Sequence, residues 1–262
     1  MSTEALRVER LAGGVVVVSL NLPDQRNAMT ETLTAAWEAA IGDLKDDREA
    51  RVVMVTGEGP AFCAGGDLGW LGVGSGLSVD QLRSRMLRFY RVWLSIRDLE
   101  IPAIAAVNGP AVGAGLALAL ACDLRYAAPE ARLSVPFTTL GIHAGMGVSW
   151  LLPEVAGLAT AREMLLTGRA VSGEEALRLG LVNGLFPADQ LRAGCLEVAA
   201  GIAGQAPVAT RLTTVALRRG HRSLAGALEW EALAQPITMA TDDALEGLAA
   251  VRERRPPHFT GR

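Results

Sequence analysis

Two Gly-rich segments share a layout that brings backbone N–H groups up to a ligand. Residues 55–68, "VTGEGPAFCAGGDL", and residues 105–120, "AAVNGPAVGAGLALAL", each run from an apolar strand pattern through glycines to the start of a helix pattern. Glycine lets the main chain approach a ligand closely, and a helix N-terminus adds unpaired N–H donors. Either loop alone is explained by tight turns and close packing. The pair, if side by side, predicts a binding site for an oxyanion.

Other common site motifs do not fit these loops. Neither segment contains GxGxxG or GxxxxGK[ST], so a dinucleotide site and a P-loop are not predicted. The stretch "GVSWL" (147–151) is not GxSxG and gives no support to a hydrolase nucleophile elbow. Cys63 lies in the first loop, but no histidine is near it in the sequence, and a buried thiol is the commoner role.

His143 is the one good titratable side chain in "VPFTTLGIHAGMG", residues 135–147. Imidazole changes its charge near neutral pH and therefore suits proton transfer. Two interpretations remain open, a catalytic base or a side chain that only caps a turn. Thr138 and Thr139 flank it but are weak bases, and Tyr90 is distant in the sequence.

The elements that must position these residues alternate between strands and helices. Short β-branched or apolar runs predict strands, and apolar residues at helical spacing predict helices. The predicted strands are 14–22, 51–57, 103–107 and 123–127, and the predicted helices are 30–47, 79–98 and 113–122. This alternation predicts an α/β fold with a parallel sheet.

The character of the chain changes after about residue 170, where every pattern is helical and no convincing strand is present. Large apolar residues of the last helices pack either on the protein's own core or on a partner subunit: Leu228, Trp230, Leu233 and Leu248. His221 and His258 also fall in this region, and we expect both at the surface or at an interface.

Composition excludes several classes of function. The 262 residues are 50% hydrophobic and suffice for a large core, while a net charge of −3 does not predict a surface for nucleic acid. Three cysteines without a CxxC motif predict neither a disulfide framework nor a zinc site. The charged N-terminus does not resemble a signal peptide. Residues 101–122 are uncharged, but Asn108, Gly109 and Pro110 interrupt them, so we expect a buried strand, turn and helix, and a cytoplasmic protein without membrane contact.

Motifs along nearly the whole chain resemble the enoyl-CoA hydratase/isomerase family, the crotonase superfamily. They are "DQRNAM", "AFCAGGDL", "IPAIAAVNGPAVGAGLALALACDLRYA", "LTGRAVSGEEALRLGLVNGLF" (166–186) and the tail "ERRPPHFTGR" (253–262). The resemblance implies a crotonase-like spiral of ββα units at 1–200, which binds acyl-CoA, and a C-terminal helical trimerisation region at 201–262. It further implies a homotrimer or a hexamer formed as a dimer of trimers, with acyl-CoA as substrate and no metal or redox cofactor.

The resemblance also implies roles for individual residues. The backbone N–H groups of Gly66 and Ala114 would hold the thioester oxygen and stabilise an enolate. Asp67, which follows the first of these positions, is expected to have a structural role. The positions implied to contact substrate or CoA are Arg26, Ala28, Ala64, Gly65, Asp67, Leu68, Pro110 and Phe137.

The carboxylates that the family uses are missing from this sequence. Hydratases of the family use two glutamates, and the corresponding residues here are Ala117 and Phe137; the aspartate of some isomerases corresponds to Gly145. General acid–base help is typically worth about 10²–10⁴-fold per group, so ordinary hydratase activity is in doubt. Three possibilities follow: a reaction such as isomerisation with His143 as the base, decarboxylation of a malonyl-type CoA, or acyl-CoA binding without turnover, against an apolar wall of Val135, Phe137, Leu140 and Ile142.

A small basic cluster near the C-terminus has two interpretations. Arg252, Arg254 and Arg255 form either a solvated tail or, as the family suggests, a group near the CoA phosphates of a neighbouring subunit. The solvated tail is the simpler interpretation.

Overall fold

The protein is described by a computed structural model that covers residues 3–67, 69, 75–220 and 223–262. Within these residues a six-stranded sheet has the order β1-β2-β3-β4-β6-β9. Its strands are β1 (Leu6–Leu11), β2 (Val15–Leu20), β3 (Val52–Gly57), β4 (Ala103–Val107), β6 (Leu124–Ala127) and β9 (Gly184–Leu185). The β1–β2 pair is antiparallel and every later pair is parallel, so the predicted α/β fold with a parallel sheet is confirmed.

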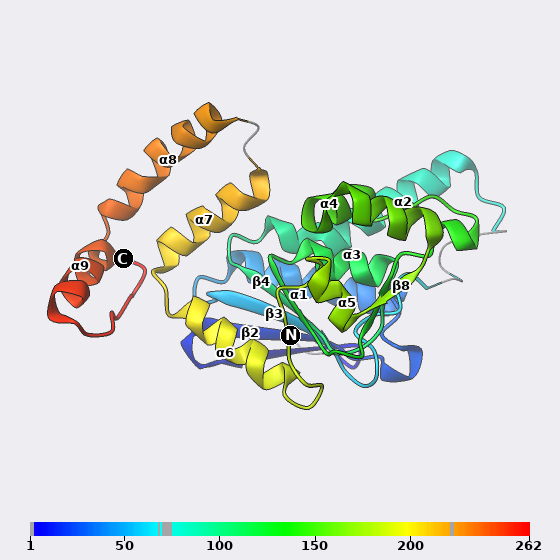
Figure 1. Ribbon diagram of the computed structural model, residues 1–262, viewed down its shortest axis with the longest axis horizontal. Coiled ribbons are helices and arrows are strands. Elements are labelled where there is room, and N and C mark those ends of the chain that lie inside the picture. Colours follow the sequence, from blue (N-terminus) through cyan, green and yellow to red (C-terminus); the bar gives the residue numbers. More distant parts are fainter. Residues whose placement is uncertain (1–2, 68, 70–74, 221–222) are drawn as a thin grey trace.

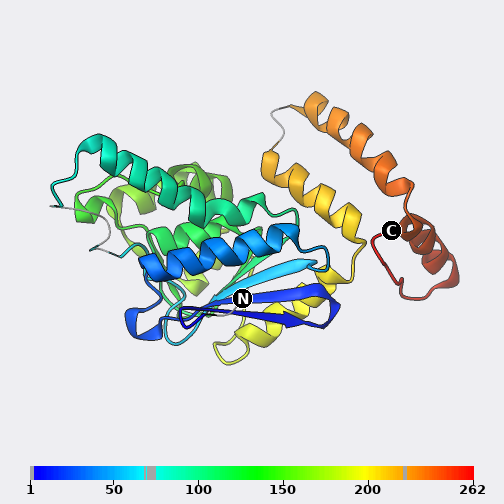
Figure 2. The ribbon, with the colours of Figure 1, turned by 180° about the vertical axis from the view of Figure 1, so that it is seen from behind.

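Helices cover both faces of this sheet (Figures 1 and 2). The long helices α1 (Glu31–Asp46) and α2 (Val79–Leu94) lie on one face with the short α3 (Ala114–Ala121), and α6 (Leu191–Ala203) packs on the other. The alternation of side chains along a strand explains the run "VVVV" in β2. Val15 and Val17 pack with α6, whereas Val16 and Val18 belong to the core beneath α1.

The two Gly-rich loops leave neighbouring strands at the same edge of the sheet. β3 and β4 pair in parallel, with Val53 opposite Ala103, so their carboxyl ends lie together. The chain after β4 then forms β5 (Ala111–Val112), which joins β7 (Arg132–Ser134) and β8 (Ala170–Ser172) in a small second sheet. This edge is the usual place for a ligand in an open parallel sheet.

The C-terminal helices extend away from the sheet (Figures 1 and 2). They are α7 (Pro207–Arg219), α8 (Leu224–Met239) and α9 (Asp242–Glu253). Arg218 anchors α7 to the core, because its guanidinium pairs with Asp123 at 2.5 Å and donates to the Ile101 carbonyl at 3.1 Å. By contrast, Leu228, Leu233 and Leu248 are 55%, 71% and 58% exposed and do not pack on the protein's own core.

The remaining differences from the sequence-based expectation lie in short or interrupted elements. The expectation that no strand follows residue 170 is wrong, because β8 and β9 are there, with three and two residues, too short to show any periodicity. The strand β1 and the helix α4 (Val148–Thr167) are additions that the pattern does not predict; Pro153 and a non-helical Gly157 interrupt α4. The remaining elements include α5 (Gly173–Arg178).

The uncharged segment 101–122 folds into β4, a turn, β5 and α3, as expected. Across the described ranges, the structure contains no helix with the length and apolar character needed to cross a membrane.

Candidate active site

A cavity of about 280 Å³ lies where the two Gly-rich loops meet. Its walls come from four segments that are far apart in the sequence: the two loops, α2, and the stretch from 136 to 146. The described residues that line it are Ala64, Gly65, Gly66, Met86, Phe89, Tyr90, Val112, Gly113, Ala114, Pro136, Phe137, Leu140, Ile142, His143, Gly145 and Met146. Most of these are apolar, with few polar groups, which is typical of a small-molecule site.

The two loops are joined by backbone hydrogen bonds. The Cys63 N–H donates to the Pro110 carbonyl at 3.1 Å, and the Val112 N–H donates to the Cys63 carbonyl at 3.0 Å. Gly65 has a φ of 94°, and a β-carbon added there would lie 2.5 Å from the Val112 carbonyl oxygen. Only glycine therefore allows the loops to approach this closely.

Gly66 and Ala114, the two predicted oxyanion positions, line this one cavity. Ala114 is the first residue of α3, so its N–H has no acceptor within the helix. The bridge between Met29 and Gly66 uses the Gly65 carbonyl, which accepts from the Met29 N–H at 2.8 Å and leaves the Gly66 N–H out of that bond. Two backbone donors of this kind can hold a developing oxyanion.

The motif "DQRNAM" forms hydrogen bonds with the first Gly-rich loop. Asn27 is fully buried; its amide nitrogen donates to the Ala61 carbonyl at 2.8 Å, and its backbone oxygen accepts from the Cys63 thiol at 3.0 Å. Arg26 accepts from the Ala64 N–H at 2.9 Å through its carbonyl, and its side chain is exposed. Arg26 and Ala28 are thus beside the loop, although neither is among the lining residues described above.

His143 lines the cavity and is exposed to solvent. Its Nδ1 lies 2.7 Å from the Ala144 carbonyl oxygen, which can only accept, so Nδ1 carries the proton and donates. In the neutral ring, Nε2 is then the unprotonated nitrogen with its lone pair available. The imidazole is held in the tautomer that a base at Nε2 requires.

Three of the four residues predicted to form the apolar wall line the cavity. Phe137, Leu140 and Ile142 line the cavity as predicted, but Val135 is fully buried beneath them and is not one of its described lining residues. Gly145 lines the cavity without a side chain. Ala117 is fully buried on α3 and does not appear among the described lining residues either.

Other residues that the resemblance points to lie around the cavity or outside it. Pro110 holds the first loop through its carbonyl, and Asp67 is half-buried directly after Gly66. Leu68 and His221 lie outside the described residues. His258 is exposed, and Arg255 forms ion pairs with Glu246 and Glu253 at 2.6 Å each. These pairs hold Arg255 within its own chain and favour the solvated tail over a phosphate site at this residue.

Cys63 has the environment of an inert thiol. It is fully buried, and burial raises its pKa to about 12; Cys122 and Cys195 are also buried and their pKa values are raised to about 12 for the same reason. Because only the thiolate reacts, we expect none of the three cysteines to react with a disulfide reagent at pH 8 in the folded protein, and all three to react after unfolding. A count of reactive thiols before and after denaturant tests this, and one fast-reacting thiol in the folded protein would contradict it.

Tyr90 is a titratable residue of the cavity that the sequence pattern does not assign to the site. It lies on α2, over fifty positions before His143, and nothing in the helix pattern distinguishes it from other half-buried residues. Burial raises the pKa of its phenol above the ordinary value, and the nearby Met146 backbone acts in the opposite direction to a smaller extent. The phenol is therefore protonated at neutral pH.

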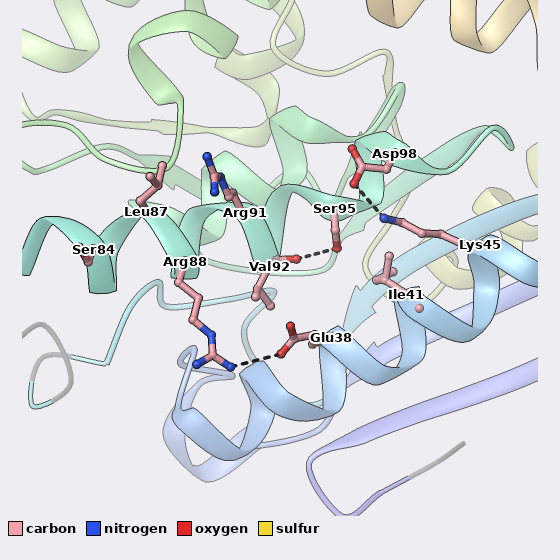
Figure 3. Close-up of a pocket in the computed structure, with 11 residues that line it drawn as sticks. Glu38, Ile41, Lys45, Ser84, Leu87, Arg88, Arg91, Val92, Ser95 and Asp98 are labelled. Carbon is pink, nitrogen blue, oxygen red and sulfur yellow. Dashed lines mark hydrogen bonds and ion pairs between the residues drawn. The ribbon is translucent and has the colours of Figure 1, made fainter.

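A larger hollow of about 540 Å³ lies between α1 and α2, on the outside of the molecule (Figure 3). Four of its charged groups form two ion pairs: Arg88 lies 4.0 Å from Glu38, and Lys45 lies 2.9 Å from Asp98. Such exposed pairs contribute little stability, typically about 0–1 kcal/mol. Neither Gly-rich loop reaches this hollow, so the smaller cavity at the loops is the better candidate site.

Comparison with known proteins agrees with this architecture. The family model described as enoyl-CoA hydratase/isomerase matches residues 10–262. The chain is 43% identical to the "Probable enoyl-CoA hydratase EchA14" of Mycobacterium tuberculosis, over 83% of this chain and 82% of that protein. It is 37% identical to the human "Enoyl-CoA hydratase domain-containing protein 2, mitochondrial", over 98% of this chain and 90% of that protein.

Solved structures of enoyl-CoA hydratases also resemble this chain. The crystal structure of enoyl-CoA hydratase from Bacillus anthracis superposes with a TM-score of 0.92 at 35% identity, covering 98% of this chain and all of that one (100%). A putative enoyl-CoA hydratase from Streptomyces coelicolor superposes with the same TM-score, 0.92, at 34% identity, covering 98% of this chain and 94% of that one. The crotonase-like fold expected from the sequence motifs is therefore confirmed, and the chain belongs to the enoyl-CoA hydratase/isomerase family of the crotonase superfamily.

Proposed function

We propose that the protein binds an acyl-CoA thioester in the cavity at the Gly-rich loops and catalyses proton transfer through a thioester enolate. The observation that carries this proposal is the meeting of three residues at one cavity: Gly66 and Ala114, whose backbone N–H groups are the proposed donors, and His143. Several relatives are named enoyl-CoA or methylglutaconyl-CoA hydratases, which supports a CoA thioester as the ligand. The chemistry needs no metal or redox cofactor.

The thioester oxygen would lie between the two backbone donors. Removal of a proton from the neighbouring carbon places negative charge on that oxygen, and prearranged donors stabilise the charge as it develops. Losing one such donor typically costs about 3–4 kcal/mol of barrier height. The backbone geometry of Gly65 and Gly113, rather than any side chain, would set the positions of these donors.

His143 would act as the base. Its Nε2 lone pair takes the proton from the carbon next to the thioester, while the Nδ1–H bond to the Ala144 carbonyl keeps the ring oriented. Phe137, Leu140 and Ile142 would surround the acyl chain and limit the access of water.

We expect the purified protein to hydrate crotonyl-CoA far more slowly than a family member with both glutamates. The reason is that Ala117 and Phe137 cannot activate water or move a proton, and each missing group typically costs about 10²–10⁴-fold. The decrease in enoyl absorbance on addition of enzyme measures this rate, with a two-glutamate hydratase as the control.

A panel of thioesters separates the remaining activities. It contains enoyl, malonyl-type, β-hydroxy and saturated acyl-CoA compounds, the last assayed by deuterium uptake from D₂O at the carbon next to the thioester. Deuterium uptake supports the proposed enolate chemistry, and release of CO₂ from a malonyl-type thioester would identify a decarboxylase. Tight binding without turnover of any compound would overturn catalysis and leave an acyl-CoA-binding protein, and rapid hydration of crotonyl-CoA would show that the missing glutamates do not matter.

We further propose that the protein is a cytoplasmic homotrimer or hexamer that uses its C-terminal helices as the interface. The structure of α8 supports this, because none of its described residues is buried and Leu224, Leu233 and Met239 are 76%, 71% and 69% exposed. Exposed apolar surface of this extent is typical of an interface. Sedimentation equilibrium is expected to give three or six times the mass of one chain, 27.5 kDa, and a monomer would contradict the proposal.

A further inference from the structure

Tyr90 and His143 are two side chains at the cavity that carry an exchangeable proton, and they come from separate walls of it. Tyr90 reaches the cavity from α2, whereas His143 belongs to the segment that follows the short helix Thr138–Leu140. The phenol is half-buried and the imidazole is exposed. The cavity therefore offers a possible donor besides the proposed base.

The hydroxyl of Tyr90 occupies the space in front of Gly145. A β-carbon added at Gly145 would lie 2.6 Å from the Tyr90 hydroxyl oxygen and 3.2 Å from the ring carbon that carries it. The absence of a side chain at 145 thus lets the phenol enter the cavity wall, and any larger residue there would push it out. The Tyr90 hydroxyl, which comes from α2, thus lies where a side chain at position 145 would lie.

The backbone next to Gly145 has an unusual conformation at the place where the Tyr90 hydroxyl approaches it. Met146, the next residue, has a φ of 53°, a left-handed conformation that is strained for a residue with a side chain, and it lines the same cavity as Tyr90. Strain of this kind persists only where the surrounding structure enforces it, and it is concentrated at functional sites. A phenol O–H is a hydrogen-bond donor, and Tyr90 lines the cavity, so its proton can be given to a group bound there.

We infer that Tyr90 is the general acid that works with His143 in the proposed reaction, an inference that rests on the proposed function. His143 Nε2 takes a proton from the carbon next to the thioester, and the electron pair of that C–H bond moves into the thioester to form the enolate. The enolate carbon then takes the proton of the Tyr90 hydroxyl. The O–H electron pair stays on the phenol oxygen, the thioester carbonyl re-forms, and solvent water carries the proton from the imidazolium back to the phenolate.

The burial of Tyr90 is consistent with this role. It raises the pKa of the phenol, which keeps the donor protonated through the neutral and mildly alkaline range.

Two variants test the donor. Tyr90→Phe keeps the ring and removes only the hydroxyl, so deuterium uptake into a saturated acyl-CoA is expected to fall by about 10²-fold or more, with unchanged acyl-CoA affinity. Without the phenol, the enolate mostly regains the same proton from His143. Tyr126→Phe is the matched control, because Tyr126 is the one other tyrosine of the chain and packs on Phe186 beneath α6, away from the cavity.

The presence of only two tyrosines allows a sharper measurement. In the Tyr126→Phe background, biosynthetic labelling with a difluorotyrosine changes position 90 alone and lowers the pKa of its phenol. A proton donor loses activity as pH rises through its own pKa, so the labelled enzyme is expected to gain an alkaline limb that unlabelled Tyr126→Phe lacks at the same pH. A phenol that only fills space would produce no such limb.

Each outcome has one meaning. Loss of deuterium uptake in Tyr90→Phe together with the new alkaline limb supports the inference. Full uptake in Tyr90→Phe, or an unchanged pH profile after labelling, overturns it and leaves the role of His143 intact. If the unmodified protein exchanges no deuterium into any acyl-CoA of the panel, the proposed function fails and the inference fails with it.

Discussion

Replacing His143 with alanine is expected to lower deuterium uptake into acyl-CoA by about 10²–10⁴-fold without changing the affinity for the thioester. The variant removes the one nitrogen lone pair that the tautomer of His143 presents, whereas the N–H groups of Gly66 and Ala114 and the apolar wall remain. Uptake measured by mass spectrometry and affinity measured by calorimetry separate catalysis from binding. Loss of the rate with unchanged affinity identifies the base.

His258→Ala is the matched control, because His258 is exposed in the C-terminal tail and donates to Glu246 through its backbone only, which the variant keeps. Chemical rescue adds a second test. His143 is exposed, so free imidazole can enter the space that the variant leaves, and its addition is expected to restore part of the rate of His143→Ala. Unchanged deuterium uptake in His143→Ala would leave the histidine as a turn residue and require another base.

The long, regular elements of the fold could be predicted from the sequence because each carries its own pattern. The strand expected at 103–107 is the observed β4, and the helix expected at 113–122 is α3 with one residue fewer at each end. The strands β8 and β9 have three and two residues and exist only through pairing with β7 and β6, so no local pattern could indicate them. The edge strand β1 alternates between apolar and charged residues only from Leu6 to Glu9, because Arg10 interrupts the pattern, and four residues are too few to predict a strand.

The part of the candidate site that lies in Gly-rich or turn-rich segments could be predicted from the sequence. The composition of the two Gly-rich loops and of the turn around His143 indicates an unusual backbone, the family resemblance implies the positions Gly66 and Ala114 within those loops, and all three residues line one cavity. Tyr90 carries no such signal, because it lies within a regular amphipathic helix and reaches the site only through the packing of α2 over Gly145. The sequence does not reveal which residues of α2 contact the segment around Gly145. It does show that residue 145 lacks a side chain, but only the structure shows that the Tyr90 hydroxyl lies at that position.

The second large effect is expected for Gly65→Ala, which alters the oxyanion site without removing either donor. Gly65 has a φ of 94°, and the added methyl group would lie 2.5 Å from the Val112 carbonyl oxygen and 3.4 Å from the Ala114 nitrogen. The two loops must therefore separate, which displaces the N–H of Gly66 relative to that of Ala114. A displacement of about 1 Å costs on the order of 10²-fold in rate, and loss of one donor costs about 10²–10³-fold.

Gly201→Ala separates this effect from a general response to an added methyl group. Gly201 lies within α6 with nothing near the position of an added β-carbon, so this variant is expected to keep full activity and to gain about 0.5–1 kcal/mol of helix stability. Gly65→Ala should instead lose kcat, even in samples that circular dichroism shows to be folded at the assay temperature. Gly65 also lines the cavity, so the affinity for acyl-CoA is measured as well: a folded Gly65→Ala enzyme with unchanged affinity and a lower kcat supports the spacing of the two backbone donors as the cause. Full activity in that variant would mean that the thioester oxygen is held elsewhere.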